Sequence, residues 1–204
     1  SPMFTRAAHA SLTSSSSSSR RVRRTGVTRC ETAGSVRREV LKREERTKLD
    51  PSSDLDFYAQ PRFVTHVDND FLAQVTELYR QRIPANSKVL DLCSSWVSHL
   101  PREVEYAKVY GHGMNATELG RNDRIDQFFV RDFNKDPRIA LESNSVDAVV
   151  CCVSVQYLQR AEEVFAEIFR VLKPGGVVII TFSNRLFYSK AIQAWRDASG
   201  YARV

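Results

Sequence analysis

The sequence predicts an α/β fold with a doubly wound, mainly parallel sheet. Short apolar stretches alternate five times with stretches in which apolar residues recur at helical spacing. The apolar run of residues 146–153 is too continuous for a half-exposed strand and is typical of a strand covered on both faces. Ligands of such sheets bind beyond the carboxyl ends of the strands, so functional residues are expected just after the strands.

The expected strands, in chain order, are residues 88–92, 107–110, 128–130, 146–153 and 177–182. The expected helices are residues 71–83, 97–105, 116–120, 161–172 and 186–198. Asp70 is the expected N-cap of the first helix, and Pro84 ends it. The stretch Lys173-Pro174-Gly175-Gly176 is expected to terminate the fourth helix.

The excess positive charge lies in an N-terminal arm. Residues 1–30 contain six arginines and no acid, which accounts for the whole formal net charge of +6. The arm is also rich in serine, and this acid-free composition is typical of an organelle transit peptide. We expect residues 1–30 to be a disordered plastid transit peptide, cleaved near Cys30, that directs the protein to the stroma. A mitochondrial address is the alternative, and an RNA-binding Ser/Arg tail is the other interpretation of the composition.

The rest of the chain divides into residues 31–53, expected to be a charged linker or solvated helix, and residues 54–204, expected to be the folded domain. No apolar run is long enough for a membrane-spanning helix. The body is neutral, which argues against nucleic acid as a partner, because phosphate binding needs a basic face. The four cysteines lack the spacing of a metal site. We therefore expect no metal, and we expect the thiols to be reduced. The sequence leaves the oligomeric state open.

Four segments are informative as a set, in their order along the chain. They are Val89-Leu90-Asp91-Leu92, Phe129-Val130-Arg131-Asp132, Ser145-Val146-Asp147-Ala148-Val149-Val150 and Leu172-Lys173-Pro174-Gly175-Gly176. In this order the chain resembles class I S-adenosylmethionine-dependent methyltransferases, and most closely the small-molecule group labelled type 11. Residues 56–64, 94–101 and 183–188 more narrowly resemble a plant and algal methyltransferase-like family that is often plastid-targeted.

The resemblance implies S-adenosyl-L-methionine as cofactor and methyl transfer to a small-molecule acceptor. The family's Rossmann-like sheet has seven strands, so strands six and seven would follow Val204 and the chain is expected to be an incomplete fragment. The implied cofactor-binding residues follow the first four strands: Asp91, Cys93, Ser94, Ser95, Gly113, Met114, Asn115, Asp132, Phe133 and Cys152. The catalytic candidates are Tyr157, which lies beyond the fourth strand, and His66 and Tyr58, which precede the sheet. Tyr58 and Arg62 belong to a segment that often closes over cofactor and substrate in this fold.

The chain departs from the family pattern in two places. The first loop, residues 91–97, has no glycine where the family has Asp-x-Gly-x-Gly-x-Gly, and Trp96 is expected to point away from the ligand. Gly113 stands where the family has the acid that holds the ribose, and Asn115 is the candidate replacement. These losses favour, as the alternative, a catalytically inactive scaffold or regulator, whose cleft Trp96 or His99 would fill. An RNA methyltransferase is a third hypothesis, against which the neutral body argues.

Overall fold

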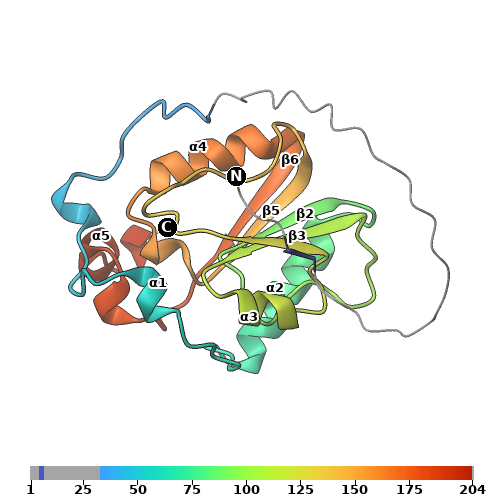
Figure 1. Ribbon diagram of the computed structural model, residues 1–204, viewed down its shortest axis with the longest axis horizontal. Helices are drawn as coiled ribbons and strands as arrows, with labels where there is room; N and C mark the ends of the chain where they lie inside the picture. Colours follow the sequence, from blue (N-terminus) through green and yellow to red (C-terminus); the bar gives the residue numbers. More distant parts are fainter. Residues whose placement is uncertain (1–4, 7–32, 204) are drawn as a thin grey trace, which may run out of the picture.

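The computed structural model describes residues 5–6 and 33–203. The expected transit peptide therefore lies outside the described residues, apart from the short strand β1 (Thr5–Arg6). The described strands form one sheet, and helices lie on both of its faces (Figure 1).

Five strands run parallel to one another in the order β4-β3-β2-β5-β6. They are β2 (Lys88–Leu92), β3 (Lys108–Gly113), β4 (Gln127–Val130), β5 (Val146–Cys152) and β6 (Leu172–Thr181). β1 pairs antiparallel with β4 at the edge. Because the chain builds outward from β2 first to one side and then to the other, the predicted doubly wound, mainly parallel sheet is confirmed.

Two helices cover the two faces of the sheet. Successive residues of a strand point to opposite faces, so the sheet supports two cores. Val89 and Val150 pack with the buried residues of α2 (Asn69–Arg82), whereas Leu90 and Val149 pack with those of α4 (Ala161–Val171). Figure 1 shows α2 and α4 on opposite sides of the strands. Burial on both faces is the reason that β5 has the continuous apolar sequence from which the sheet was predicted.

The remaining helices are short. They are α1 (Asp54–Phe57), α3 (Ala116–Arg121), α5 (Gln193–Asp197), η1 (Glu44–Arg46), η2 (Val155–Tyr157), η3 (Tyr188–Lys190) and η4 (Tyr201–Arg203).

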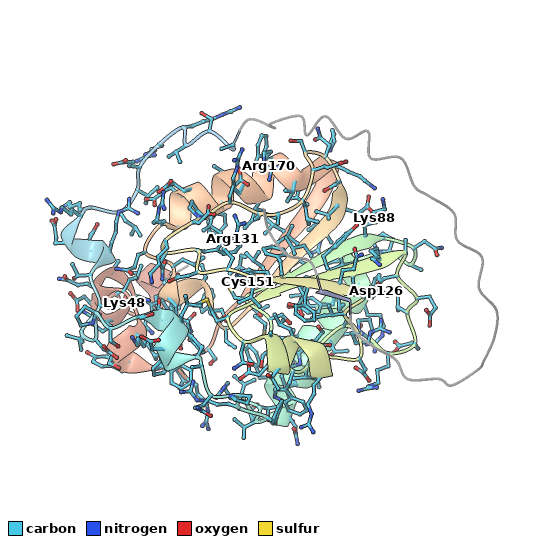
Figure 2. All side chains as sticks on the ribbon, in the orientation of Figure 1. Lys48, Lys88, Asp126, Arg131, Cys151 and Arg170 are labelled. Carbon is cyan, nitrogen blue, oxygen red and sulfur yellow. The ribbon has the colours of Figure 1, made fainter. Side chains whose placement is uncertain are left out.

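In Figure 2 the labelled Lys88 lies at the amino end of β2, and the labelled Lys48 lies on the opposite side of the molecule, near α1. The carboxyl ends of the strands therefore face α1.

Two of the expected helices are wrong. Residues 97–105 form turns and bends, because Pro101 lacks a backbone donor and the Ser98 hydroxyl is drawn to the carboxylate of Asp91. Residues 186–198 are divided between η3 and α5, and the break follows Lys190, whose ammonium is buried and donates to the carbonyl oxygen of Ser52 at 2.8 Å.

Two helix boundaries also differ from expectation. The N-cap of α2 is Asp68 and not Asp70, since the Asp68 carboxylate accepts a hydrogen bond from the Phe71 amide at 2.9 Å. The expected terminator, residues 173–176, lies inside β6 as an irregularity: Val146 pairs with Leu172, but Ala148 pairs with Val177.

The charged segment before the domain contacts the body of the protein. Glu162 of α4 accepts hydrogen bonds from the backbone amides of Val40 and Leu41, and it forms an ion pair with Arg46 at 2.6 Å. Within residues 33–53 the helical structure is limited to the single turn η1. These residues therefore follow the surface of α4, and α1 begins after them at Asp54.

Candidate functional site

A cavity of about 520 Å³ lies at the carboxyl ends of β2, β3, β4 and β5. Its inner wall includes residues that end or follow these strands: Asp91, Cys93, Gly113, Asp132 and Cys152. Its outer wall includes residues of the strap, defined here as residues 54–67, and of the segment 184–187. Every cofactor-binding residue and catalytic candidate expected from the sequence lines this one cavity.

Asp91 is held by the first loop. Ser94 Oγ donates to Asp91 Oδ2 at 2.6 Å, and Ser98 Oγ donates to the same oxygen. Within the described residues no hydrogen bond reaches Oδ1. Burial raises the pKa of Asp91 to about 6, against which the two hydroxyl donors act. The carboxylate is thus fixed on one oxygen and free on the other.

The first loop compensates for its missing glycines with strained backbone. Cys93 has a φ of 55°, in the left-handed region that favours glycine. Val153, which follows β5 and also lines the cavity, has a φ of 46°. Such backbone in residues with a β-carbon is uncommon, and it clusters at functional sites. The loop therefore makes this turn without glycine, at some conformational cost.

The same loop explains why no acid stands at position 113. A Cβ atom on Gly113 would lie 2.4 Å from the Ser94 carbonyl oxygen. The Ser94 amide also donates to the His112 carbonyl at 2.6 Å, which holds the loop against the end of β3. Only glycine fits at this approach, so the ribose acid of the family cannot be placed at this position.

The imidazole of His112 is committed to structure. Its Nδ1 accepts from the Cys93 amide at 3.2 Å, and its Nε2 therefore donates to the Arg131 carbonyl at 2.9 Å. The ring stacks on Phe133 with centroids 3.7 Å apart. With both nitrogens engaged, His112 is not a free base, and one face of Phe133 is covered.

Asn115 has no hydrogen-bonding capacity left for a ligand. Its amide nitrogen donates to the carbonyls of Tyr58 and Ala59, and its oxygen accepts from the amides of Thr117 and Glu118. The side chain thus caps α3 and holds the strap to it. It lines the cavity, but the expectation that it replaces the ribose acid does not agree with these contacts.

Glu118, which the sequence analysis missed, supplies a carboxylate to this wall. Its Oε1 accepts from the Arg62 amide at 2.6 Å, and its Oε2 accepts from Ser95 Oγ at 2.6 Å. The side chain is 9 % exposed and lines the cavity. It belongs to the first turn of α3 rather than to a strand end, and the pattern Asn115-x-x-Glu118 on its own indicates only helix capping.

Asp132 follows β4 and also faces the cavity. Its Oδ1 accepts from the Asn134 amide at 2.9 Å, and Lys135 Nζ lies 4.0 Å from Oδ2. Asp132 therefore caps its own turn and keeps one oxygen for other contacts. Together with Asp91 and Glu118 it gives the inner wall three largely buried carboxylates.

The three catalytic candidates differ in burial and in their contacts. Burial raises the pKa of Tyr58 and of Tyr157, so both phenols stay protonated at neutral pH. Tyr157 Oη accepts from the Phe187 amide at 2.8 Å and keeps its own proton to donate. His66 is exposed at the rim, with its ring 5.2 Å from that of Phe187. Of these three side chains, only His66 suits a base.

Trp96 and His99 line the cavity without filling it. Trp96 Nε1 donates to the Val64 carbonyl at 3.1 Å, and its ring meets Phe63 edge to face with centroids 6.3 Å apart. Trp96 therefore fastens the strap to the first loop. Burial lowers the pKa of His99, which favours its neutral form. The cavity remains open, unlike the blocked cleft expected of an inactive scaffold.

The described residues, 5–6 and 33–203, contain no group of three or more His, Cys, Asp or Glu side chains placed to hold a metal ion. They also contain no helix with the length and apolar character needed to cross a membrane.

Residues 93–180, from the first loop to β6, match a family model described as a methyltransferase domain. The sheet order β4-β3-β2-β5-β6, with the cavity at the carboxyl ends of the strands, is that of a doubly wound parallel sheet. The fold is the Rossmann-like fold of class I methyltransferases. The matched stretch includes all of the predicted cofactor-binding residues except Asp91.

Solved structures with this fold are similar only at low identity. An S-adenosylmethionine-dependent methyltransferase from Mesorhizobium loti is 18% identical, with a TM-score of 0.43, over 51% of this chain and 51% of that chain. Phosphoethanolamine N-methyltransferase 2 from Haemonchus contortus, in complex with S-adenosyl-L-methionine, is 19% identical, with a TM-score of 0.48, over 69% of this chain and 35% of that one. The chain thus spans about half of the length of the first protein and less than half of the second. A search of curated proteins finds no match.

Proposed function

We propose that the protein transfers a methyl group from S-adenosyl-L-methionine to a small-molecule acceptor. The observation that carries this proposal is the set of three largely buried carboxylates, Asp91, Glu118 and Asp132, on the inner wall of one cavity at the carboxyl ends of the strands. The cofactor is a cation with several hydrogen-bond donors, which such a wall suits. The cavity volume is typical of a small-molecule site.

The residues present fit the cofactor. Asp91 would hold its amino group through Oδ1, the oxygen that the serines leave free. Glu118 would hold the ribose hydroxyls in place of the acid that Gly113 excludes. Asp132 would hold the adenine through Oδ2, the oxygen that its own turn leaves free, next to the largely buried ring of Phe133. Each role uses a side chain that lines the cavity.

The mechanism requires little chemistry of the protein itself. The cofactor supplies a methyl group on a positively charged sulfur that is already a good leaving group, so the chain has to align the acceptor and exclude water. The strap, held by Trp96 and Asn115, covers the cavity and does both. Tyr58 and Tyr157 donate hydrogen bonds that orient an acceptor, and His66 takes its proton where the acceptor is an O–H or N–H group.

Isothermal titration of the full chain with S-adenosyl-L-methionine and S-adenosyl-L-homocysteine tests cofactor binding. We expect saturable heat for both, lost in the Asp91→Asn variant and kept in Glu142→Gln, whose exposed side chain lies before β5, away from the cavity. The absence of heat and of any thermal shift at millimolar ligand would refute the proposal.

An inactive, methyltransferase-like regulator remains a second candidate, and the commitment of Asn115 to four protein hydrogen bonds favours it. The two candidates differ in turnover. If the chain binds cofactor but releases no S-adenosyl-L-homocysteine when it is incubated with a plastid metabolite extract, the regulator is supported. Release above the level of the Asp91→Asn variant supports the enzyme.

We also propose that residues 1–30 direct the protein to the plastid, on the strength of their six arginines, their serines and their lack of acids. The test is uptake of the radiolabelled chain by isolated chloroplasts and mitochondria. Protease-protected, shortened protein in chloroplasts, lost when residues 1–30 are removed, is the expected result. Protection only in mitochondria, or in neither, would contradict it.

A further inference from the structure

The lining of the cavity is divided by charge. The carboxylates Asp91, Glu118 and Asp132 belong to the inner wall, where the strands end. The outer wall contains two arginines, Arg62 of the strap and Arg185 of the segment 184–187, and its one carboxylate, Asp54, is paired with lysines. If the inner wall serves the cationic cofactor, the outer wall is the place for the acceptor, and its charge has the opposite sign.

Arg62 is held in a fixed position by aromatic rings. Its guanidinium carbon lies 4.5 Å from the ring centroid of Phe57, 5.4 Å from that of Phe187 and 5.8 Å from that of Tyr58. One nitrogen, Nη2, donates to the Phe57 carbonyl at 3.0 Å. Ring faces attract a guanidinium without neutralising its charge. The remaining N–H groups form no hydrogen bond to protein within residues 33–203, so a half-buried guanidinium keeps donors that a ligand can use.

Arg185 adds a second positive charge at the rim. Its backbone amide donates to Ser183 Oγ at 3.1 Å, which fixes the turn, while its side chain is exposed. Across the described part of the chain neither Arg62 nor Arg185 forms an ion pair with a carboxylate. Six other arginines do form such ion pairs, namely Arg46, Arg80, Arg102, Arg131, Arg160 and Arg170, but none of these six lines the cavity.

The carboxylates closest to this wall are already engaged. Asp54 lines the cavity, but it forms an ion pair with Lys48 at 2.5 Å and lies 3.5 Å from Lys190 Nζ. Glu118 accepts the backbone amide of Arg62 and the hydroxyl of Ser95. The counter-charge for the two arginines is therefore expected to come from the ligand.

We infer that the methyl acceptor carries an oxyanion, a carboxylate or a phosphate, that Arg62 binds with the help of Arg185. This inference rests on the proposed function for the identity of the site. A planar guanidinium with free N–H groups matches two oxygens of such an anion. The rings of Phe57, Tyr58 and Phe187 border the same guanidinium and would contact an apolar or aromatic part of the acceptor next to the anion.

Matched pairs of probes test the inference on the full chain. Benzoate is compared with benzamide, and phenyl phosphate with phenol, by ligand-detected NMR with and without S-adenosyl-L-homocysteine. We expect the anion of at least one pair to bind about ten-fold more tightly than its neutral partner, because charge-assisted hydrogen bonds exceed neutral ones by about that factor. The two pairs distinguish a carboxylate from a phosphate.

Variants connect the preference to the residues. In Arg62→Gln the anion preference should disappear, and in Arg62→Lys it should persist in weakened form. Arg102→Gln, at an exposed arginine outside the cavity, should leave it unchanged. Affinity for S-adenosyl-L-homocysteine should stay within about two-fold in all three variants, which shows that each is folded, since Arg62 contacts Glu118 through its backbone amide, and the substitutions change only its side chain.

Two outcomes would overturn the inference. In the first, the wild-type chain binds S-adenosyl-L-homocysteine, but at millimolar concentration it binds both members of every pair equally or not at all. That result leaves the proposed function standing. The other is an anion preference that survives Arg62→Gln. If anions bind through Arg62 while the cofactor does not bind, the anion site is upheld and the proposed function fails instead.

Discussion

Ser95 Oγ donates a hydrogen bond to Glu118 Oε2 at 2.6 Å, and this contact joins the first loop to α3. The contact holds the Glu118 carboxylate at the inner wall of the cavity. No acid can stand at the end of β3 itself, because a side chain at Gly113 would collide with the Ser94 carbonyl oxygen. The site thus keeps the charge that a cationic ligand needs, but the charge comes from a different element.

The first prediction concerns Glu118. Glu118→Gln keeps the size of the side chain and an acceptor for the Arg62 amide, but it removes the negative charge. We expect the affinity for S-adenosyl-L-homocysteine to fall about ten-fold or more, the effect of removing a charge-assisted pair. Titration calorimetry of this variant beside Glu142→Gln measures the loss. Equal affinities of the two variants would show that Glu118 does not contact the ligand.

The raised pKa of Asp91 predicts that the stability of the protein depends on pH. Its pKa of about 6 in the folded chain lies above its ordinary value of 3.8, so between these values the folded state binds more protons than the unfolded state. The free energy of unfolding therefore falls, through this group, as the pH rises from about 4 to 6. Asp91→Asn removes the effect, so relative to wild type the variant should gain about 2 kcal/mol between pH 4.5 and 7.5.

Urea denaturation of wild type and Asp91→Asn at the two pH values measures this difference, and the contributions of the other groups cancel in the comparison. A difference between the two proteins that is the same at both pH values would mean that Asp91 titrates normally.

The left-handed backbone of Cys93 predicts how two substitutions at this position change the stability of the protein. Because its φ is 55°, Cys93→Gly relieves a cost of about 1–2 kcal/mol, and Cys93→Val adds to it through a branched Cβ. We expect the glycine variant to be the more stable of the two by about 2 kcal/mol and to keep its affinity for the cofactor. Thermal and urea unfolding compare them. Two variants of equal stability would argue against a left-handed residue at this turn.

The same cysteine should be the most reactive thiol of the domain. The hydrogen bond with the thiol of Cys151 lowers the pKa of Cys93, whereas burial raises that of Cys152 to about 11. Iodoacetamide should therefore modify Cys93 before Cys151 and Cys152, and S-adenosyl-L-homocysteine should slow the reaction. Peptide mapping by mass spectrometry follows each site. Faster modification of Cys152, or no protection by the ligand, would contradict the proposed location of the cofactor.

The sheet could be predicted because each of its strands has a local pattern. The run of residues 146–153 reflects burial on both faces, and this pattern needs no knowledge of distant residues. The polar residues after the strands followed from the sheet, since parallel strands bring their carboxyl ends to one edge, and all of the predicted residues do line one cavity there.

Other features depend on contacts between distant residues and could not be predicted. Lys190 interrupts the expected last helix because its ammonium pairs with Asp50 at 3.1 Å, a residue far away in the sequence. Glu118 has a helix-capping pattern, and its place in the cavity is set by Ser95 and Arg62. The full commitment of Asn115 follows from the position of the strap.

A crystal structure of the full chain with S-adenosyl-L-homocysteine tests the central claim most directly. We predict the ligand in the cavity at the carboxyl ends of β2, β3 and β4, with Asp91 at its amino group and Glu118 at its ribose hydroxyls. A cavity without ligand at saturating concentration, or a ligand bound elsewhere on the protein, would contradict the account.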